Sequence, residues 1–512
     1  MSELARSRFL LAAWCVALFA FSFALNSRHQ QFPYYYHPDE PGKVEQILTG
    51  EWNLHHPLLL LQATKLGVAL AGTERAEQPI VEAGRAVSAL FIAGAIVALS
   101  LLAFCWRGWG AAIATGAVFA WHHQLYELSH YLKEDSALLF GIALACLTAW
   151  LYAERPSSQR AAFLGLACGL AISGKYLGIV TLGIALPVLW RASRTRFSAA
   201  FVIALLATVI LVNLPVFAHL DTFRSSFSRE TALVVKGQSG MTRNLPHSES
   251  WSAFLDNATP AMWPLLLIFF YARSRQRRSI NAAEIVLTLF PVAFALVLSF
   301  SPKSNDRYFL PASALFALFA VIGASDLARL LSPRFPRPLV FGVAAVALVA
   351  AQFPSWSASR GGWLAYERAF QTDDNADLIA WLNSNVPPGA VIAKDNRVAL
   401  PDPRRKKHAA RLGIIPQKVI TPTWEGKRTN FAADLGPLEK MRAEGITHVA
   451  VSEMDYGKFF RASLRPQDSD RANFERRRAF YERLFREAEL LWHRDKSLVL
   501  YLHPGIRVYR LR

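Results

Sequence analysis

The sequence predicts a polytopic α-helical membrane protein with a small α/β domain at its C-terminal end. Of the 512 residues, 53% are hydrophobic and only 18% are charged, which is too apolar for an ordinary soluble protein. The apolar residues form blocks close to the length of about 20 residues that crosses a bilayer as a helix. After about Gln352 the composition changes and becomes polar and mixed in charge.

Eleven apolar runs are the predicted membrane-spanning helices. They cover residues 9–25, 87–105, 110–126, 136–153, 161–173, 176–190, 199–216, 260–272, 282–300, 309–330 and 338–354. The first run follows Arg6 and Arg8 and has no clear cleavage site. Whether it is an anchor or a signal peptide, the residues after it are delivered outside.

The arginines predict the orientation of these spans. With a cytoplasmic N-terminus, every inner connection carries arginine, as the positive-inside rule requires. These arginines are Arg107, Arg155, Arg160, Arg191, Arg194, Arg196, Arg273, Arg275, Arg277, Arg278, Arg329, Arg334 and Arg337. The formal net charge of +18 therefore reflects topology, and we expect no nucleic-acid partner. The four cysteines lie inside apolar runs, so no disulfide framework or thiolate metal site is predicted.

The outer connections contain most of the chemically interesting residues. They include residues 26–85, 127–135, 217–258 and 301–308, together with the short Ser173–Tyr176 segment. Acids or cations from five segments thus meet on one membrane face, which indicates a site there. Within the first connection, residues 53–70 are too short to span, and we expect an interfacial helix.

Residues 356–512 are predicted to form a separate outer domain of ordinary domain size, after a membrane module of residues 1–355. We expect helices at residues 377–385 and 473–491, the second with Asn473 as its N-cap. Strands are expected at residues 390–393, 448–451 and 497–501.

The stretch Tyr34–Lys43 is the first candidate for chemistry. It places Asp39 and Glu40 between Pro38 and Pro41, which restrict the backbone. Ionisable groups beside a membrane are costly unless they face water or a partner. One acid of such a pair can act as a general base while the other orients it or binds a metal. The alternative is an exposed pair of loop acids without a role.

The other outer loops offer a second set of candidates. Lys133, Glu134 and Asp135 form either a second acidic site or a cluster that caps a helix. Lys175 interrupts an apolar run and needs a partner or an anion. Arg307 and Tyr308 form either a cationic site for a phosphate, which arginine binds with two hydrogen bonds, or an interfacial anchor.

Two further groups leave their roles open. His55 and His56 could join a carboxylate as zinc or manganese ligands, cap a helix, or contact a substrate; their spacing matches no metal signature. The basic run at residues 404–408 is either a solvated loop or a contact for an anionic headgroup or acceptor.

Taken in order, these residues resemble the membrane glycosyltransferases of the GT-C class that use a polyprenyl-phosphate-linked sugar. The resemblance is strongest to the bacterial relatives of protein O-mannosyltransferases and to the aminoarabinose transferases that modify lipid A. The resemblance covers about residues 1–350. It rests on residues 37–40, Asn53–Pro57, Arg85, Glu134-Asp135, Gly174–Tyr176 and Arg307–Pro311.

The resemblance implies transfer of a hexose or pentose, with inversion, to an extracytoplasmic lipid, glycan or protein. Asp39 would be the general base, with Glu40 beside it in the catalytic pair. The residues implied to position acceptor or donor are His37, His55, His56, Glu134 and Asp135. Those implied to bind the lipid phosphate are Arg85, Lys175, Arg307 and Tyr308.

The implied protein lies in a bacterial inner membrane, among membrane lipids, with its C-terminal domain outside the cytoplasm. A divalent metal is possible at Asp39, Glu40 and Asp135. No nucleotide cofactor is expected, since no glycine-rich phosphate loop is present. The acceptor motif of oligosaccharyltransferases is also missing, so transfer to asparagine is not expected.

Two other function classes remain as alternatives. A secondary transporter would place ionisable residues near the bilayer midplane and show repeat symmetry between its halves. A glycan ligase or polymerase would use outer-face cations but would not need the paired acids of the first loop.

Overall fold

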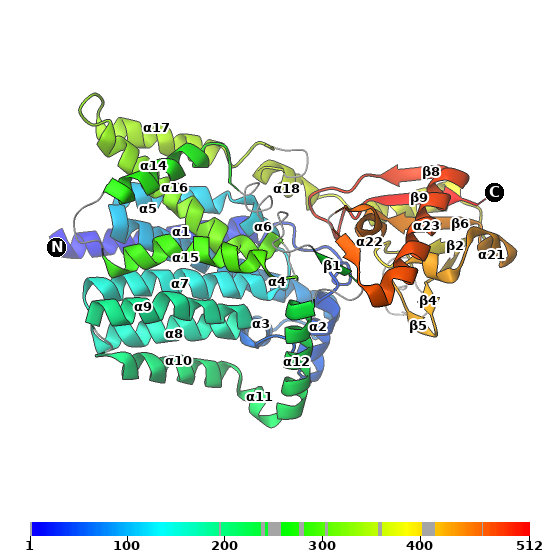
Figure 1. The fold of residues 1–512 in the computed structure, drawn as a ribbon, viewed down its shortest axis with the longest axis horizontal. Coiled ribbons are helices and arrows are strands. Elements are labelled where there is room, and N and C mark those ends of the chain that lie inside the picture. The colour runs from blue at the N-terminus through cyan, green and yellow to red at the C-terminus, as the bar shows by residue number, and fades with distance from the viewer. Residues whose placement is uncertain are drawn as a thin grey trace. The chain divides into compact units, whose positions relative to one another are not determined.

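The computed structural model describes residues 3–193, 196–236, 241–243, 258–275, 281–302, 306–356, 361–401, 415–462 and 464–511. Its contacts divide the chain into two compact units (Figure 1). The first is Met1–Tyr34, Asp39–Ala232 and Pro246–Leu364. The second is Tyr35–Pro38, Leu233–Leu245 and Ala365–Arg512. The expected division at residue 355 therefore differs from the observed one by two short internal segments and a few residues.

The first unit is built from helices, many of which run side by side in Figure 1. In chain order they are α1 (Glu3–Asn26), α2 (Glu40–Thr49), α3 (Leu59–Ala71), α4 (Glu77–Arg107), α5 (Trp109–Ala120), α6 (His123–Ser129), α7 (Glu134–Glu154), α8 (Ser158–Gly174), η1 (Tyr176–Thr181), α9 (Leu182–Ser193), α10 (Ser198–Val212), α11 (Leu214–Ala218), α12 (Leu220–Lys236), α14 (Met262–Arg275), α15 (Ala282–Ser299), η2 (Asp306–Phe309), α16 (Leu310–Leu330) and α17 (Arg337–Ala350). Helix α18 (Trp363–Ala369) spans the boundary in sequence.

Helices occupy all of the apolar runs that the sequence predicted as spans. Within the described residues, six helical segments are long and apolar enough to cross a membrane, and four shorter apolar helices accompany them. The structure thus supports a helical membrane protein without establishing the count of eleven spans. An interfacial helix was expected over residues 53–70. The helix found there, α3, begins only at Leu59.

Small residues allow the central helices of the first unit to pack closely, as is common between membrane helices. A Cβ added to Gly141 of α7 would lie 2.4 Å from the Cα of Ala171 in α8. A Cβ on Gly165 of α8 would lie 2.2 Å from the carbonyl oxygen of Phe201 in α10. Both contacts involve backbone atoms, so only glycine fits at either position.

Charged residues connect four of these helices near one end of the bundle. Asp326 of α16 accepts hydrogen bonds from Arg107 at the end of α4 (3.3 Å) and from Arg273 of α14 (2.7 Å). Arg273 also pairs with Glu284 of α15 at 2.9 Å. These side chains are almost fully buried, and their pairing offsets the cost of removing charge from water.

The second unit contains a five-stranded sheet in the order β3-β2-β6-β9-β8. The strands are β2 (Val391–Lys394), β3 (Lys418–Ile420), β6 (His448–Ser452), β8 (Glu489–Arg494) and β9 (Ile506–Arg510). Strands β3, β2 and β6 run parallel, and β9 is antiparallel to β6 and β8. The shorter strands are β1 (Met241–Arg243), β4 (Thr423–Trp424), β5 (Lys427–Arg428) and β7 (Leu464–Pro466), with β1 paired to β7.

Apolar side chains cover the two faces of this sheet, as the alternation of a strand requires. Val449 and Val451 of β6 belong to a core that includes Tyr481 of α23 (Arg471–Glu487). Ala450 belongs to a second core with Leu378 of α19 (Asp374–Asn385). The remaining helical pieces are η3 (Ala432–Leu435), α21 (Leu438–Ala443), α22 (Glu453–Tyr456), η4 (Gly457–Phe460) and η5 (Asp468–Asp470).

Several details of this unit correct the sequence-based expectation. Residues 497–501 form a turn and not a strand. The Val499 side chain is fully buried, and its carbonyl accepts hydrogen bonds from the N–H groups of Leu502 and His503, which closes the turn. Helix α23 starts at Arg471, two residues before the predicted cap, and stops at Glu487 because β8 begins there. The basic run at residues 404–408 lies outside the described residues.

A buried pair of acids at the carboxyl ends of β2 and β6 gives a first prediction. Asp395 accepts hydrogen bonds from the Ala432 and Ser452 N–H groups and from the Tyr481 hydroxyl, at 2.7, 2.9 and 2.8 Å. Burial and the neighbouring Asp455 nevertheless raise the pKa of Asp395 to about 8. The native state then binds more protons than the unfolded chain, whose aspartates titrate near ~3.9. Stability contributed by Asp395 is therefore lost as pH rises toward 8.

We expect Asp455→Asn to reduce this loss, because it removes the second negative charge. The measurement is the temperature at which protease cleaves within residues 391–452 of the full chain, at pH 5 and pH 8. Asp468→Asn, at an exposed site, is the control. If the cleavage temperature of Asp455→Asn falls between pH 5 and pH 8 by as much as that of wild type, the role assigned to the pair is wrong.

Candidate functional site

The start of α2 places three ionisable residues of the first loop close to one another. Asp39 stands at the N-cap position, and Pro41 occupies the first turn, where its missing N–H costs nothing. Glu40 and Lys43 are three residues apart and share one helix face. Both are buried, whereas Asp39 is not.

Glu40 is held in a buried ion pair with Arg85 of α4. The Nε and Nη2 groups of Arg85 donate to the two carboxylate oxygens of Glu40 at 3.0 and 2.6 Å. Glu40 also accepts the Leu132 N–H at 2.9 Å. The Nη1 group of Arg85 donates to the backbone carbonyls of Gln30 and Phe32, and the Phe32 ring covers the guanidinium.

This environment differs from the one expected for either residue. Both side chains are fully buried and their polar groups are engaged by protein. A lipid phosphate could reach Arg85 only by displacing Glu40. The pair therefore acts as a clasp that joins α2, α4 and the segment before α7.

Asp39 is the only one of the four predicted acids whose carboxylate reaches solvent. Its side chain is 43% exposed, and it forms an ion pair with Lys133. Lys133 is itself buried and occupies the N-cap position of α7, from where its Nζ reaches Asp39. An accessible carboxylate beside a buried cation can accept a proton from an incoming group while remaining fixed in place.

Glu134, in the first turn of α7, forms a buried ion pair with Lys43 of α2. The distance from Lys43 Nζ to Glu134 Oε1 is 2.7 Å, and Lys43 also donates to the Leu132 carbonyl at 2.8 Å. Burial lowers the pKa of Lys43, an effect that Glu134 opposes. Burial also lowers the pKa of His56, although Glu134 opposes this effect, and the imidazole is therefore neutral near pH 7.

Asp135 brings together two cations that the sequence places far apart. Its Oδ1 accepts a hydrogen bond from Lys175 Nζ at 2.6 Å, and its Oδ2 lies 3.5 Å from Arg307 Nε. The Tyr308 ring centroid lies 4.6 Å from Lys175 Nζ. Two cations therefore lie against one carboxylate here, an arrangement that an anionic oxygen could join.

The expected histidines are distributed differently. His37 is fully buried and belongs to the second unit, where its ring lies 4.3 Å from that of Tyr501. The adjacent Tyr36 donates a hydrogen bond of 2.8 Å to Asp373 of the same unit. His55 is half-buried, and its Nδ1 has no hydrogen-bond partner within the described part of the chain.

The structure gives partners to two lysines of the predicted loops: Lys43 pairs with Glu134, and Lys133 pairs with Asp39. Both were visible in the sequence: Lys43 follows Glu40 at helical spacing, and Lys133 directly precedes Glu134. Within the described residues, no group of three metal-binding side chains converges. Asp39, Glu40 and Asp135 instead contact separate cations, so the geometry does not favour a metal shared by them.

One part of the chain matches a known protein family. Residues 72–229 match the family described as dolichyl-phosphate-mannose-protein mannosyltransferase. That range contains Arg85, the Glu134-Asp135 pair and Lys175, and it begins after Asp39. No curated protein matches the chain.

Among solved structures, ArnT from Cupriavidus metallidurans bound to undecaprenyl phosphate is similar over 98% of this chain and 98% of its own, with a TM-score of 0.51 and 14% identity. Its apo state is similar over 100% and 99%, with a TM-score of 0.50 and 14% identity. The Archaeoglobus fulgidus oligosaccharyltransferase tethered to an acceptor peptide matches over 98% and 74%, with a TM-score of 0.49 and 12% identity, too low to carry an argument.

The resemblance to membrane GT-C glycosyltransferases is thereby confirmed, and the chain has an ArnT-like fold. Spans of sufficient length and this fold make it an integral membrane protein.

The clasp between Glu40 and Arg85 predicts a strong effect on stability. Arg85→Met should destabilise the first unit by roughly 3–5 kcal/mol, because Glu40 would remain buried without its cation. The double variant Glu40→Gln/Arg85→Met should recover much of this loss. The measurement is the temperature at which detergent-solubilised protein loses its monodisperse peak. A single variant as stable as wild type would show that the pair is not a structural clasp.

Proposed function

We propose that this protein transfers a sugar from a polyprenyl phosphate to an acceptor on the outer face of the membrane, with inversion and with Asp39 as the general base. The observation that carries the proposal is the contrast among the four acids: Glu40, Glu134 and Asp135 are buried, and Asp39 alone is open to an incoming group. The ArnT-like fold and the match to a mannosyltransferase family support the same class of reaction.

The proposed reaction is a single displacement at the anomeric carbon. The acceptor hydroxyl or amine gives its proton to Asp39 while its oxygen or nitrogen forms the new bond to that carbon. The bond between the anomeric carbon and the phosphate oxygen breaks, and the phosphate leaves with the electron pair. A displacement from the opposite face inverts the configuration, and no covalent sugar–enzyme intermediate is needed.

Lys175 and Arg307 are proposed to stabilise the departing phosphate. Both contact Asp135, and their side chains are partly exposed, at 13% and 23%. Fixed cations near a group that gains negative charge stabilise the transition state more than the ground state. The related ArnT structure contains undecaprenyl phosphate, which supports a ligand of this type here. Arg85 is proposed to act through Glu40 rather than on the phosphate.

The topology that fits this proposal has about eleven spans, a cytoplasmic N-terminus and the second unit outside the cytoplasm. His55, His56, Glu134 and Lys43 then lie where they can orient the acceptor or the sugar. A bacterial inner membrane suits such a protein, and the acceptor is a lipid, glycan or protein.

Replacement of Asp39 separates binding from transfer. We expect Asp39→Asn to retain a sugar-bearing polyprenyl phosphate during purification, because the donor site stays intact while transfer stops. Wild type should carry the bare phosphate or no lipid. Native mass spectrometry of both proteins from detergent is the measurement. Glu45→Gln, an exposed acid on the same helix, is the control and should behave as wild type.

The same lipid in wild type and Asp39→Asn, or no polyprenyl lipid in either, would count against Asp39 as the base.

Loss of Arg307 tests the phosphate site without leaving Asp135 unpaired, since Lys175 still bonds to it. We expect Arg307→Gln to weaken binding of undecaprenyl phosphate by about tenfold, the effect of losing one charge-assisted hydrogen bond. Titration of purified protein with this lipid in detergent measures the dissociation constant. Lys65→Gln, which removes an exposed cation on α3, should leave it unchanged. Equal affinities for Arg307→Gln and wild type would exclude Arg307 from the site.

A further inference from the structure

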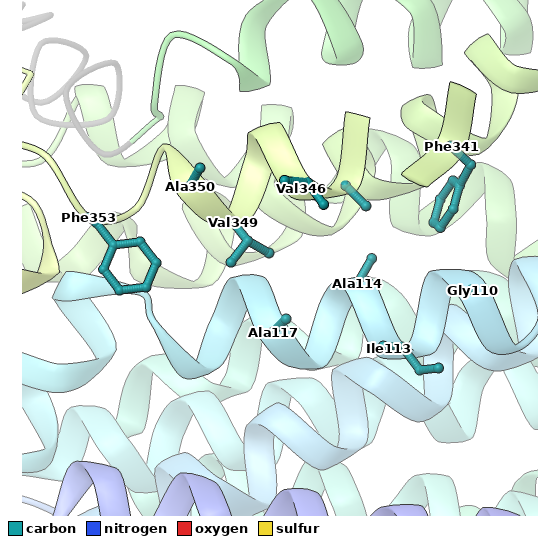
Figure 2. A pocket seen from close by; sticks show the side chains of 10 residues that line it. Gly110, Ile113, Ala114, Ala117, Phe341, Val346, Val349, Ala350 and Phe353 are labelled. Carbon is teal, nitrogen blue, oxygen red and sulfur yellow. The ribbon is translucent and has the colours of Figure 1, made fainter. Parts of the chain in front are cut away.

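An apolar cavity of about 600 Å³ lies between α5 and α17 of the first unit. Figure 2 shows its lining side chains on the two helices, which run side by side there. Much of the lining is small: Gly110, Ala114 and Ala117 come from α5, and Ala345 and Ala350 from α17. The cavity exists because these short side chains do not fill the space between the helices.

The lining residues follow the spacing of a single helix face on each side. On α17 they are Phe341, Ala345 and Val349 with their neighbours, at intervals of four. None of the lining side chains carries a charge or a hydroxyl group. The lining positions run from Gly110 to Ala117 on α5 and from Phe341 to Ala350 on α17, which is about 10–14 Å of helix axis. This is most of the roughly 15 Å of hydrocarbon in one leaflet, so the cavity admits much of one lipid chain lengthwise.

One end of the cavity is basic. Both lining helices begin there, since the Phe341 ring lies 3.1 Å from where a Cβ on Gly110 would stand. Arg107 precedes α5 by two residues, and Arg337 opens α17 one turn before Phe341 on the same face. Arg337 is exposed and makes only a long hydrogen bond, 3.5 Å, to Ser332 among the contacts recorded for it in the described chain.

The charges at this end do not balance. Arg107, Arg273 and Arg329 all approach Asp326, at 3.3, 2.7 and 3.9 Å. Glu284 is a second acid of the group, bound to Arg273. Among the described residues of this group, three arginines approach two carboxylates that are already engaged, and Arg337 adds a further positive charge beside them in sequence. Arg329 is about half exposed and, with Arg337, supplies positive charge that an anion from the membrane can neutralise.

This basic end lies far from the candidate site. Arg85, in the clasp, and Arg107 stand on the same helix and are separated by about 33 Å of helix axis, which is the thickness of the hydrocarbon core. A headgroup at Arg337 would therefore belong to the opposite leaflet from the phosphate that the proposed function assigns to Lys175 and Arg307. The cavity is not the continuation of that phosphate site.

We propose that this cavity is a binding site for an anionic phospholipid of the leaflet opposite the candidate site. One acyl chain lies between α5 and α17, and the phosphate group contacts Arg337, with Arg329 nearby. The lipid fills a gap that the protein leaves open and joins α17 to the body of the first unit. Basic pockets between membrane helices commonly bind anionic headgroups in this way.

The test uses the full chain, exhaustively delipidated in detergent and then incubated with phosphatidylglycerol or phosphatidylcholine. Native mass spectrometry counts the bound lipid. We expect one phosphatidylglycerol per chain, bound about fivefold more tightly than phosphatidylcholine. Ala345→Phe, which fills the cavity, should lose this lipid. Ala347→Phe adds the same ring at an exposed position outside the cavity lining on the same helix and should keep it.

The charge is tested separately, so that a folding defect in Ala345→Phe cannot decide the outcome. Arg337→Gln should abolish the preference for phosphatidylglycerol while the elution profile stays that of wild type. Arg191→Gln, an exposed arginine at the end of α9, should retain the preference. Equal lipid occupancy in Ala345→Phe and Ala347→Phe, an unaltered preference in Arg337→Gln, or a polyprenyl phosphate as the only bound lipid would each overturn the proposal.

Discussion

The buried ion pair between Glu40 and Arg85 is the interaction on which the rest of the candidate site depends. It fixes the first turn of α2 against α4, and through the Leu132 N–H it fixes α2 against the start of α7 as well. Once α2 has this position, Asp39 meets Lys133 and Lys43 meets Glu134 without further adjustment. A charge pair without access to water contributes little net stability, but breaking it is costly, so it selects one arrangement over others.

Adjacent acids thus acquire opposite roles from their surroundings. Asp39 and Glu40 are neighbours in sequence, yet the first is exposed to solvent while both carboxylate oxygens of the second accept hydrogen bonds from protein. The contrast therefore separates one exposed carboxylate, that of Asp39, from one that is part of the packing. Each acid also meets its own cation, which limits repulsion between four carboxylates gathered in a small region.

The sequence could predict the helical membrane class and most of the residues of this site, because apolar blocks and isolated charges are local signals. It could not predict which cation meets which acid. The sequence alone favours Arg85 as a phosphate ligand, because only the folded chain shows that Glu40 pairs with its guanidinium. Lys43 is visible in the sequence at helical spacing from Glu40, but its partner Glu134 appears only in the fold. Strand assignments failed for a similar reason at Val499, where burial in a turn resembles burial in a strand.

The short segment Tyr35–Pro38 has a consequence for the biosynthesis of the protein. Its contacts are with Asp373 and Tyr501, which leave the ribosome only after every helix of the first unit. Asp39 follows Pro38 by one peptide bond, so the loop before it makes these contacts only after residues 373 and 501 have been synthesised. A chain that ended early would insert its helices but lack the partner for His37. The segment Tyr35–Pro38 therefore takes its packing from residues that follow it by more than 330 positions.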